Sequence, residues 1–334
     1  MGKGFLYING RTRKPESCKW LHAKKGGNTL RTVTWENIGT SVRGEKKVED
    51  VLTAAGLNYT VEKRPVYRYE RNPRKLVRIP NRFTCERRED GHSYDEIVSG
   101  KYTIVQNREA FDFVNYMGDE VEFLKAGETA NGLVYIIGRL PDVNILGDPF
   151  TPHVIFSNSF TGKTSIRAAI CPLRIICQNQ FATAFKDTHN AVSVGHTASA
   201  ERKLKEARSV LRASADYMED LNRMAEGYAS MKVSPRQVSM VLDAMFPVQA
   251  DAPQKRAADI AAKKAKFEAR FRRAMDSPDN YVFRGTAWQL VNAYTDVLTH
   301  QPLSGKSTYD SQFVKVTFGN DTSKFLKIVD AVAV

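Results

Sequence analysis

The chain has 334 residues, a length that suits one large core or two ordinary domains, and its 42% of hydrophobic residues excludes disorder over most of the chain. Its net charge is +13, and residues 1–90 alone carry 21 Lys and Arg against 10 Asp and Glu. A cationic region of this kind attracts polyanions, and nucleic acid is the commonest polyanion in a cell. A basic protein that binds no polyanion is the plainer alternative.

Cysteine and histidine usage argues against a disulfide scaffold and against a metal site. The four cysteines form no C-x-x-C pair, and the six histidines are scattered without H-E-x-x-H or H-x-H spacing. We therefore predict reduced thiols, no metal and no cofactor. The N-terminal sequence lacks the apolar core of a signal peptide, and no apolar run is long enough to span a membrane, so we expect a cytoplasmic protein without membrane contact.

The patterning divides the chain into three parts. Their bounds are residues 1–35, a basic and irregular arm; residues 36–200, an α+β core; and residues 201–334, an all-helical domain. In the arm, the turn signal Asn9-Gly10 indicates a short hairpin at Leu6–Ile8.

The core begins with a helix over residues 46–56, which ends at the C-cap signal Gly56. A second helix is expected over residues 109–117, with Asn107 as its N-cap. Pro172 is expected to mark a bulge or turn between two strands. The other expected elements are a helix at 178–186 and strands at 58–69, 82–87, 102–105, 121–125, 133–139, 154–157, 165–169, 173–176 and 192–194.

The last part is helical in pattern throughout. Capping boxes at Ser234–Gln237 and Thr286–Gln289 mark the starts of two helices. The expected helices are 201–228, 235–245, 254–275, 287–298 and 322–329. Consecutive strands followed by helices predict an α+β fold, with an antiparallel-rich β-sheet, a basic β-hairpin and packing helices, followed by an all-helical C-terminal part.

The strongest functional signal is the segment Lys63–Arg88, in which ten Lys and Arg alternate with Tyr67, Tyr69 and Phe83. Proteins that bind single strands need cations to neutralise phosphates and aromatic faces to stack on unpaired bases. On a regular strand Lys63 and the two tyrosines face one way, whereas Arg64 and Arg68 face the other. The tyrosines and part of the cations therefore need not share a surface. A solvated, charged edge hairpin with no ligand uses the same residue types and is the alternative.

Two further basic features are weaker. The helix at 254–275 carries eight Lys and Arg beside an apolar face, which suits DNA, a membrane surface or a partner, or a plain solvated face. Arg167 and Arg174 lie on strands that lead towards a helix start, where they could meet a phosphate. Structural pairing with Asp112 or Asp148 is the alternative for these arginines.

No catalytic residue is predicted. Ser304–Ser307 contains Gly-Lys-Ser, but a phosphate-binding loop needs glycine where the chain has His300. Acids that could hold Mg²⁺ for a nuclease are usually solvent-exposed at such helix ends and strand starts, so a metal-dependent nuclease is kept only as a further alternative. These acids are Asp112, Asp119, Glu120 and Glu122.

Four blocks of sequence resemble a family of phage- and plasmid-borne proteins of unknown function. The blocks are Val48–Tyr67, Lys101–Phe113, Ser165–Asn179 and Val192–Thr197, in the family's order. The resemblance implies a protein of a mobile element, encoded among replication and recombination genes and acting in a bacterial host cell. At the level of fold alone, the pattern is similar to ring-forming single-strand annealing proteins of the recombination-mediator type, which implies a homo-oligomer, ring or filament, and adds Lys101 to the binding groove.

We therefore expect a protein that binds single-stranded DNA and anneals strands in phage or plasmid recombination and replication. The alternative is a mobile-element regulator or anti-defence protein that binds a host protein through an exposed apolar patch. The expected nucleic-acid-binding residues are Lys63, Arg64, Tyr67, Arg68, Tyr69, Arg71, Arg74, Lys75, Arg78, Arg82, Lys101, Arg167 and Arg174.

Overall fold

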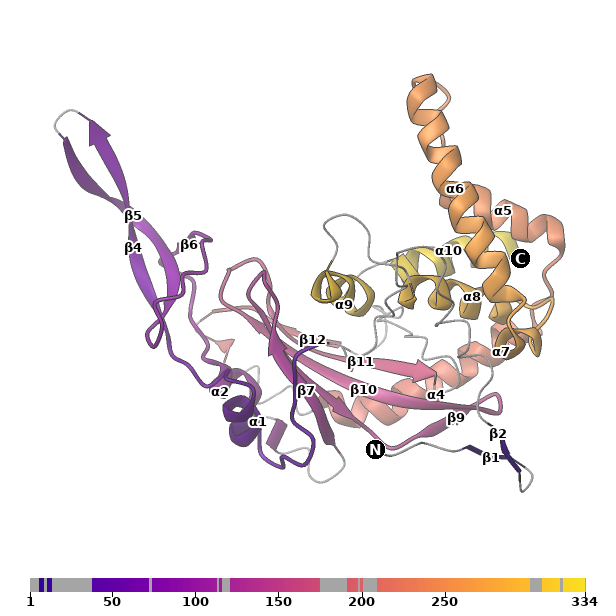
Figure 1. Ribbon diagram of the computed structural model, residues 1–334, viewed down its shortest axis with the longest axis horizontal. Helices are drawn as coiled ribbons and strands as arrows, with labels where there is room; N and C mark the ends of the chain where they lie inside the picture. Colours follow the sequence, from indigo (N-terminus) through magenta and orange to yellow (C-terminus); the bar gives the residue numbers. More distant parts are fainter. Residues whose placement is uncertain are drawn as a thin grey trace.

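The structure of the protein is a computed structural model (Figure 1). Its main body is built on an antiparallel sheet. The structure describes residues 6–8, 11–13, 38–71, 74–112, 114–115, 121–174, 191–197, 199–200, 209–300, 308–318 and 321–333. The sheet has seven strands in the order β12-β11-β10-β8-β7-β3, with β9 also paired to β10. The strands are β3 (Thr40–Ser41), β7 (Glu122–Glu128), β8 (Leu133–Arg139), β9 (Val143–Ile145), β10 (Asp148–Ser159), β11 (Ile166–Arg174) and β12 (Ala191–Val194).

The central strands β8 and β10 are buried on both faces, which explains the apolar runs Leu133–Ile137 of β8 and Val154–Phe156 of β10. Ile136 and Phe156 point into a core that the N-terminal helices complete. Ile137 and Ile155 point to the other face, where Phe313 of α9 (Tyr309–Phe318) packs on them. The sheet is therefore the middle layer of the molecule.

The strand β11 runs through Pro172, where the sequence predicted a bulge or turn between two strands. Pro172 lies opposite Pro152 of β10 in an unbroken antiparallel register. Neither proline has an N–H, so they can oppose each other only where the ladder needs no donor from either residue. The prediction of two separate strands was therefore wrong.

Two short helices cover one face of the sheet near the N-terminal end of the described core. Helix α1 (Val48–Ala54) ends as predicted, with Gly56 in the left-handed region at a φ of 68°. Helix α2 (Asn107–Phe111) is capped by Gln106 rather than by Asn107, because Gln106 and Glu109 form a reciprocal capping box.

The segment 102–105, predicted as a strand, makes no ladder. It crosses the sheet edge as extended chain held by side chains: the Tyr102 hydroxyl donates to the carbonyl of Ser159, and the Asn158 amide donates to the carbonyl of Val105.

Two predicted features are confirmed at the N-terminus and at β12. The strands β1 (Leu6–Ile8) and β2 (Arg11–Arg13) pair as a hairpin, and β12 forms the edge of the main sheet.

A second, three-stranded sheet stands away from the main one (Figure 1). It consists of β4 (Val61–Arg71), β5 (Arg74–Arg87) and the short β6 (Val98–Ser99). The long β4–β5 hairpin projects from the body with its tip far from the main sheet. At about 3.3 Å per residue, eleven residues of β4 reach about 36 Å.

The C-terminal part is helical, as predicted, and shares a core with the main sheet. Helix α8 lies at its centre, with Trp288 buried and Tyr294 stacked on Phe325 at 4.0 Å between ring centroids. The same core takes in Phe150 and Ile170 of the sheet. The helices are α4 (Ser209–Ser230), α5 (Pro235–Met245), α6 (Gln254–Met275), α7 (Pro278–Tyr281), α8 (Ala287–Thr299), α9 and α10 (Asp321–Ala333).

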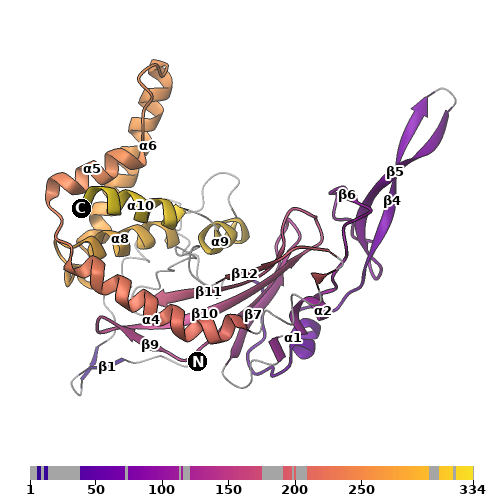
Figure 2. The same ribbon diagram turned by 180° about the vertical axis from the view of Figure 1, so that it is seen from behind.

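Figure 2 shows α4 running along the face of the sheet opposite α9. The α5 capping box is confirmed, whereas the short α7 and α9 were not predicted. The predicted helix at 178–186, the predicted strand end at 175–176 and the start of the helix at 201 lie outside the described residues. Within the described part, no helix has the length and apolarity that a membrane span requires.

Candidate nucleic-acid interface

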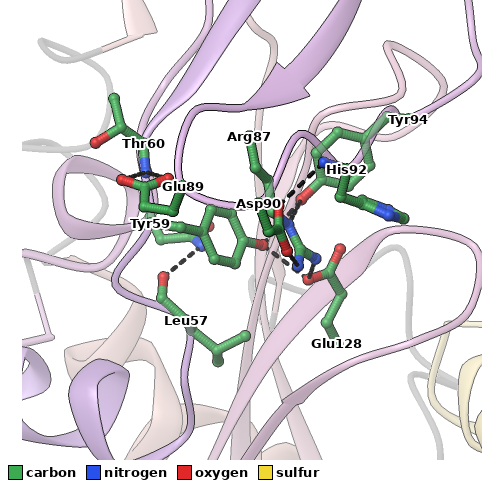
Figure 3. A network of polar contacts seen from close by, with 10 residues as sticks. Leu57, Tyr59, Thr60, Arg87, Glu89, Asp90, His92, Tyr94 and Glu128 are labelled. Atoms are coloured by element: carbon green, nitrogen blue, oxygen red, sulfur yellow. Dashed lines mark hydrogen bonds and ion pairs between the residues drawn. The ribbon is translucent and has the colours of Figure 1, made fainter.

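A network of polar side chains connects the β4–β5 hairpin to the main sheet (Figure 3). We call the end of the hairpin near Tyr59 and Arg87, where it joins the body, its root. The Tyr59 hydroxyl donates to Glu128 of β7 at 2.8 Å, and the Tyr94 hydroxyl donates to Tyr59 at 3.0 Å. Arg87 of β5 donates to the Tyr94 hydroxyl and forms an ion pair with Glu128. Its guanidinium also lies 4.1 Å from the centre of the Tyr59 ring. These contacts fix the direction in which the hairpin leaves the body.

Burial favours the protonated form of the two tyrosine hydroxyls in this network. It raises the pKa of Tyr94 to about 12, and it raises the pKa of Tyr59 further, with help from the negative charge of Glu128. Both phenols therefore remain donors at neutral pH. A second tie comes from Glu89, whose carboxylate accepts the backbone N–H of Thr60 at 2.9 Å.

An irregularity divides the hairpin into an inner and an outer half. The register shifts between Pro65 and Tyr67, because residues 79–82 of β5 bulge outwards opposite a single residue of β4. Asn81 adopts a left-handed φ of 56° there, and its side chain accepts the N–H of Gly100 at 3.0 Å. We call residues 67–71 and 74–78, beyond this bulge, the outer hairpin.

One face of the outer hairpin gathers aromatic, apolar and cationic side chains. Residues directly opposite each other in an antiparallel pair lie on the same face. The pairs here are Tyr67 with Arg78, Tyr69 with Leu76, and Arg71 with Arg74. Tyr67, Tyr69 and Leu76 are 51%, 60% and 69% exposed, so their apolar surface is available to a ligand. We call these six residues the aromatic face.

The arginines of the aromatic face form no ion pair with any other described residue. On the opposite face of the outer hairpin, Arg68 and Lys75 share the carboxylate of Glu70, at 2.7 and 3.9 Å, and in the inner half Arg64 pairs with Glu86 at 3.0 Å. We call Arg64, Arg68, Lys75 and their acids the ion-paired face. The structure thus divides the predicted hairpin cations into two sets, and only one set shares a surface with the tyrosines.

Near the root, Phe83 is enclosed by the protein's own cations. Lys63 and Arg78 lie 5.5 and 5.7 Å from the centre of its ring, and the Lys63 ammonium donates to the carbonyl of Gly100. A base would have to displace these cations to stack on Phe83. Arg82 and Lys101 are exposed beside β6, on the inner half of the hairpin.

The two arginines of β11 lie away from the hairpin. Arg167 stands between Ser157 of β10 and Ser193 of β12, and it lines a polar pocket of about 680 Å³ between the sheet, the loop at 92–96 and α9. The side chain of Arg174 lies outside the described residues. The structure therefore does not join Arg167 to the predicted binding face.

The acids considered for a nuclease do not converge among the described residues. Glu122 pairs with Arg43, and Asp112 accepts from the Asn115 amide. Asp119 and Glu120 lie outside the described part, and no cluster of three or more His, Cys, Asp or Glu occurs within it. Burial also raises the pKa of the Cys85 thiol to about 11, which keeps it protonated.

Sequence reasoning noted that the tyrosines and part of the cations need not share a face, but it missed Leu76 and did not work out which cations join the rings. A signal for both was present. Counting outwards from a two-residue turn at Asn72-Pro73 pairs residue 71 with 74, 69 with 76, and 67 with 78, as observed. That count would have placed three arginines beside the tyrosines.

Comparison with known proteins gives a family and no activity. Residues 96–317 match the family described as a domain of unknown function (DUF932). No curated protein and no solved structure matches the chain. The matched region spans most of the main sheet and the helices from α2 to α9, and it begins after β4 and β5. Because the match covers well over half of the 334 residues, the chain belongs to the DUF932 family.

Proposed function

We propose that the chain binds single-stranded DNA on the aromatic face of the outer hairpin. The observation that supports this proposal is the sorting of side chains, because exposed tyrosines and three arginines without an ion pair to a described residue share one face of the outer hairpin, while Arg68 and Lys75 share Glu70 on the other. A hairpin that only had to stay soluble would need no such sorting. Phosphate neutralisation and base stacking are the two components of binding to unpaired strands.

The spacing of the face suits an extended strand. Tyr67 and Tyr69 are two residues apart on β4, so their rings are offset by about 7 Å, a distance that an extended polynucleotide can match with successive bases. The arginines flank the rings on both sides, where the phosphates of such a strand would lie. Leu76 adds apolar surface opposite Tyr69.

In the fuller form of this proposal, the chain anneals strands in recombination or replication of a phage or plasmid, in the cytoplasm of its bacterial host. Annealing requires no catalytic acid or metal; it requires a strand held extended with its base edges exposed. A homo-oligomer, as a ring or filament, would align the outer hairpins of successive subunits along one strand. The projection of the hairpin from the body leaves its aromatic face open for this arrangement (Figure 1).

A second candidate rests on Leu76. Together with Tyr67 and Tyr69 it forms an exposed apolar patch, which is also typical of a protein-binding surface. On this alternative the chain is a regulator or anti-defence protein of a mobile element that binds a host protein, and the arginines contribute only to solubility.

Binding of a fluorescent oligonucleotide across a salt series tests the proposal. We expect R71Q/R74Q/R78Q to weaken single-strand binding at least about tenfold and to lower the salt slope by about 2, at about 0.7 per lost phosphate contact. The matched control R64Q/R68Q/K75Q removes the same formal charge from the ion-paired face and should change the affinity less than about threefold. Mass photometry of the same samples measures the oligomer.

Two results would contradict the proposal. Equal losses in the two triple variants would mean that net charge alone attracts the DNA. Absence of binding by the unmodified chain at low salt would favour the protein-binding alternative, which Leu76→Asp would then test by loss of the partner while R71Q/R74Q/R78Q retains it.

A further inference from the structure

A second projection, at the opposite end of the molecule, is formed by the N-terminal half of α6 (Figure 1). We call residues 254–266 the α6 arm. The C-terminal half of the helix is anchored in the helical core, where Phe271 is buried against Phe325 and Phe267 packs on Tyr294. Every residue of the arm is exposed or only partly buried. The arm therefore contributes little to the core.

The charges of α6 fall into two groups. Three cations serve the fold: Lys264 pairs with Asp243 of α5, Arg272 pairs with Glu268, and Arg270 donates to the carbonyl of His300 at 3.2 Å. The other five form no ion pair with a described residue and are exposed. They are Lys255, Arg256, Lys263, Lys266 and Arg273.

The unpaired cations lie along one side of the helix. Arg256, Lys263, Lys266 and Arg273 are spaced by seven, three and seven residues, which places them in one stripe. Asp259 lies in the same stripe, so the arm is not uniformly positive. Between Arg256 and Lys266 the helix rises about 15 Å, enough to follow several phosphates of a nucleic-acid strand.

The face of the helix beside this stripe carries small side chains. Ala258, Ala261, Ala262 and Ala265 are exposed, and the arm contains no aromatic residue. Alanine maintains the helix without a core contact and lets a flat or convex polyanion approach closely. A membrane-surface helix would need large apolar side chains beside the cations, and Ile260 is the arm's single large aliphatic residue.

We propose that the α6 arm is a second nucleic-acid-binding surface, which holds the phosphodiester backbone by ionic contacts alone. Without aromatic rings it has no means of preferring unpaired bases, so it binds duplex DNA as readily as single strands. The aromatic face and the α6 arm lie at opposite ends of the folded molecule. One molecule would then hold a single strand at one end and a second nucleic-acid segment at the other. This division of roles rests on the proposed function of the hairpin; binding at the arm does not.

The test uses the full chain and a fluorescent duplex in a salt series. We expect K255Q/R256Q/K263Q/K266Q to weaken duplex binding at least about tenfold and to lower the salt slope by about 3 to 4, at about 0.9 per lost contact. The matched control K232Q/R236Q/K324Q/K327Q removes four exposed cations elsewhere on the helical part and should change the affinity less than about threefold. Glutamine is a good helix former, and circular dichroism checks that α6 is retained.

The outcomes separate the two sites. Equal losses in the arm variant and its control, or no loss in either, would overturn the inference. So would loss of binding to vesicles containing phosphatidylglycerol with duplex binding unchanged, because the arm would then be a membrane surface. If R71Q/R74Q/R78Q leaves the preference for single strands intact while the arm variant loses duplex binding, the hairpin proposal fails and the arm proposal stands; the reverse pattern has the reverse meaning.

Discussion

The strands β8 and β5 are both parts of antiparallel ladders, yet their side chains have opposite surroundings. Six of the seven residues of β8 are buried, whereas Cys85 is the one buried residue among the 14 of β5. The apolar sequence of β8 is accounted for by folding, because each side chain leaves water. The outer part of β5 gains no such stabilisation, because its side chains remain largely in contact with water.

The difference also shows why the hairpin needs a fastened root. An isolated two-stranded hairpin is marginally stable in water. The outer hairpin has cross-strand pairs but no covering layer, while its root is tied to β7 through Glu128, Arg87 and two tyrosines. Stability is thus concentrated in the sheet and at the root, and the side chains of the outer hairpin remain largely exposed.

The largest expected effect on the free energy of unfolding comes from a substitution in the core of the main sheet. Phe156 of β10 is 1% exposed in the core, so Phe156→Ala removes a large ring and leaves a cavity. We expect a loss of about 4 kcal/mol in the free energy of unfolding. Urea unfolding followed by circular dichroism measures it.

Tyr69→Ala is the matched control, since it removes a similar ring from the outer hairpin. Its effect on the free energy of unfolding should stay within about 0.5 kcal/mol, although single-strand binding should weaken by about 1–3 kcal/mol. Similar destabilisation by the two substitutions would break the comparison.

The next effect is at the root, where the two regions meet. Glu128→Ala removes the more buried of two carboxylates that pair with the partly buried guanidinium of Arg87, the other being the exposed Asp90, and we expect a cost of about 3 kcal/mol. Hydrogen exchange should show faster exchange in β4 and β5 than in β8. The double variant Arg87→Met with Glu128→Leu should recover part of the loss, because no unpaired charge remains; an even larger loss would contradict a role based on charge.

The smallest effect is a response to acid, which should be confined to the sheet because the outer hairpin contains no histidine. Burial lowers the pKa of His153 from 6.5 to about 4, and the neighbouring charge of Arg139 acts in the same direction while Asp142 opposes it. On acidification, His153 is therefore protonated near pH 6.5 in the unfolded chain but only near pH 4 in the folded chain. Acidification thus favours the unfolded state, and stability returns as the pH rises.

Between pH 7 and pH 5 this difference amounts to about 2 kcal/mol in the free energy of unfolding. Urea unfolding at the two pH values measures it, and His153→Gln should flatten the dependence. A dependence that His153→Gln leaves unchanged would assign the acid response to other groups, such as His196, whose pKa burial also lowers.

The elements that the sequence predicted well are those with a local cause. Helix α5 begins at a capping box of Ser234 and Gln237, and α6 has the predicted bounds Gln254–Met275, because caps and periodicity act within a few residues. The strand predicted at 102–105 failed because its apolar alternation is satisfied by side-chain contacts to β10 instead of a ladder. Only tertiary structure decides between these two uses of the same pattern.

The candidate site was predictable in composition but not in arrangement. The alternation of Tyr67 and Tyr69 with Arg68 identified a charged strand, yet which cations join the rings depends on the register with β5. The sharing of Glu70 by Arg68 and Lys75 depends on the same register. The small residues and unpaired cations of the α6 arm were visible in the sequence, whereas its projection from the body was not.

The bulge at residues 79–82 has a consequence for how such a protein can vary. It absorbs the mismatch between the inner and outer registers. Because side chains alternate with a period of two, adding or removing two residues on each strand would lengthen or shorten the hairpin by about 7 Å and leave every remaining side chain on its original face. Insertion or deletion of residues near the tip would thus change the length of the aromatic face, while the root and the sheet remain as they are.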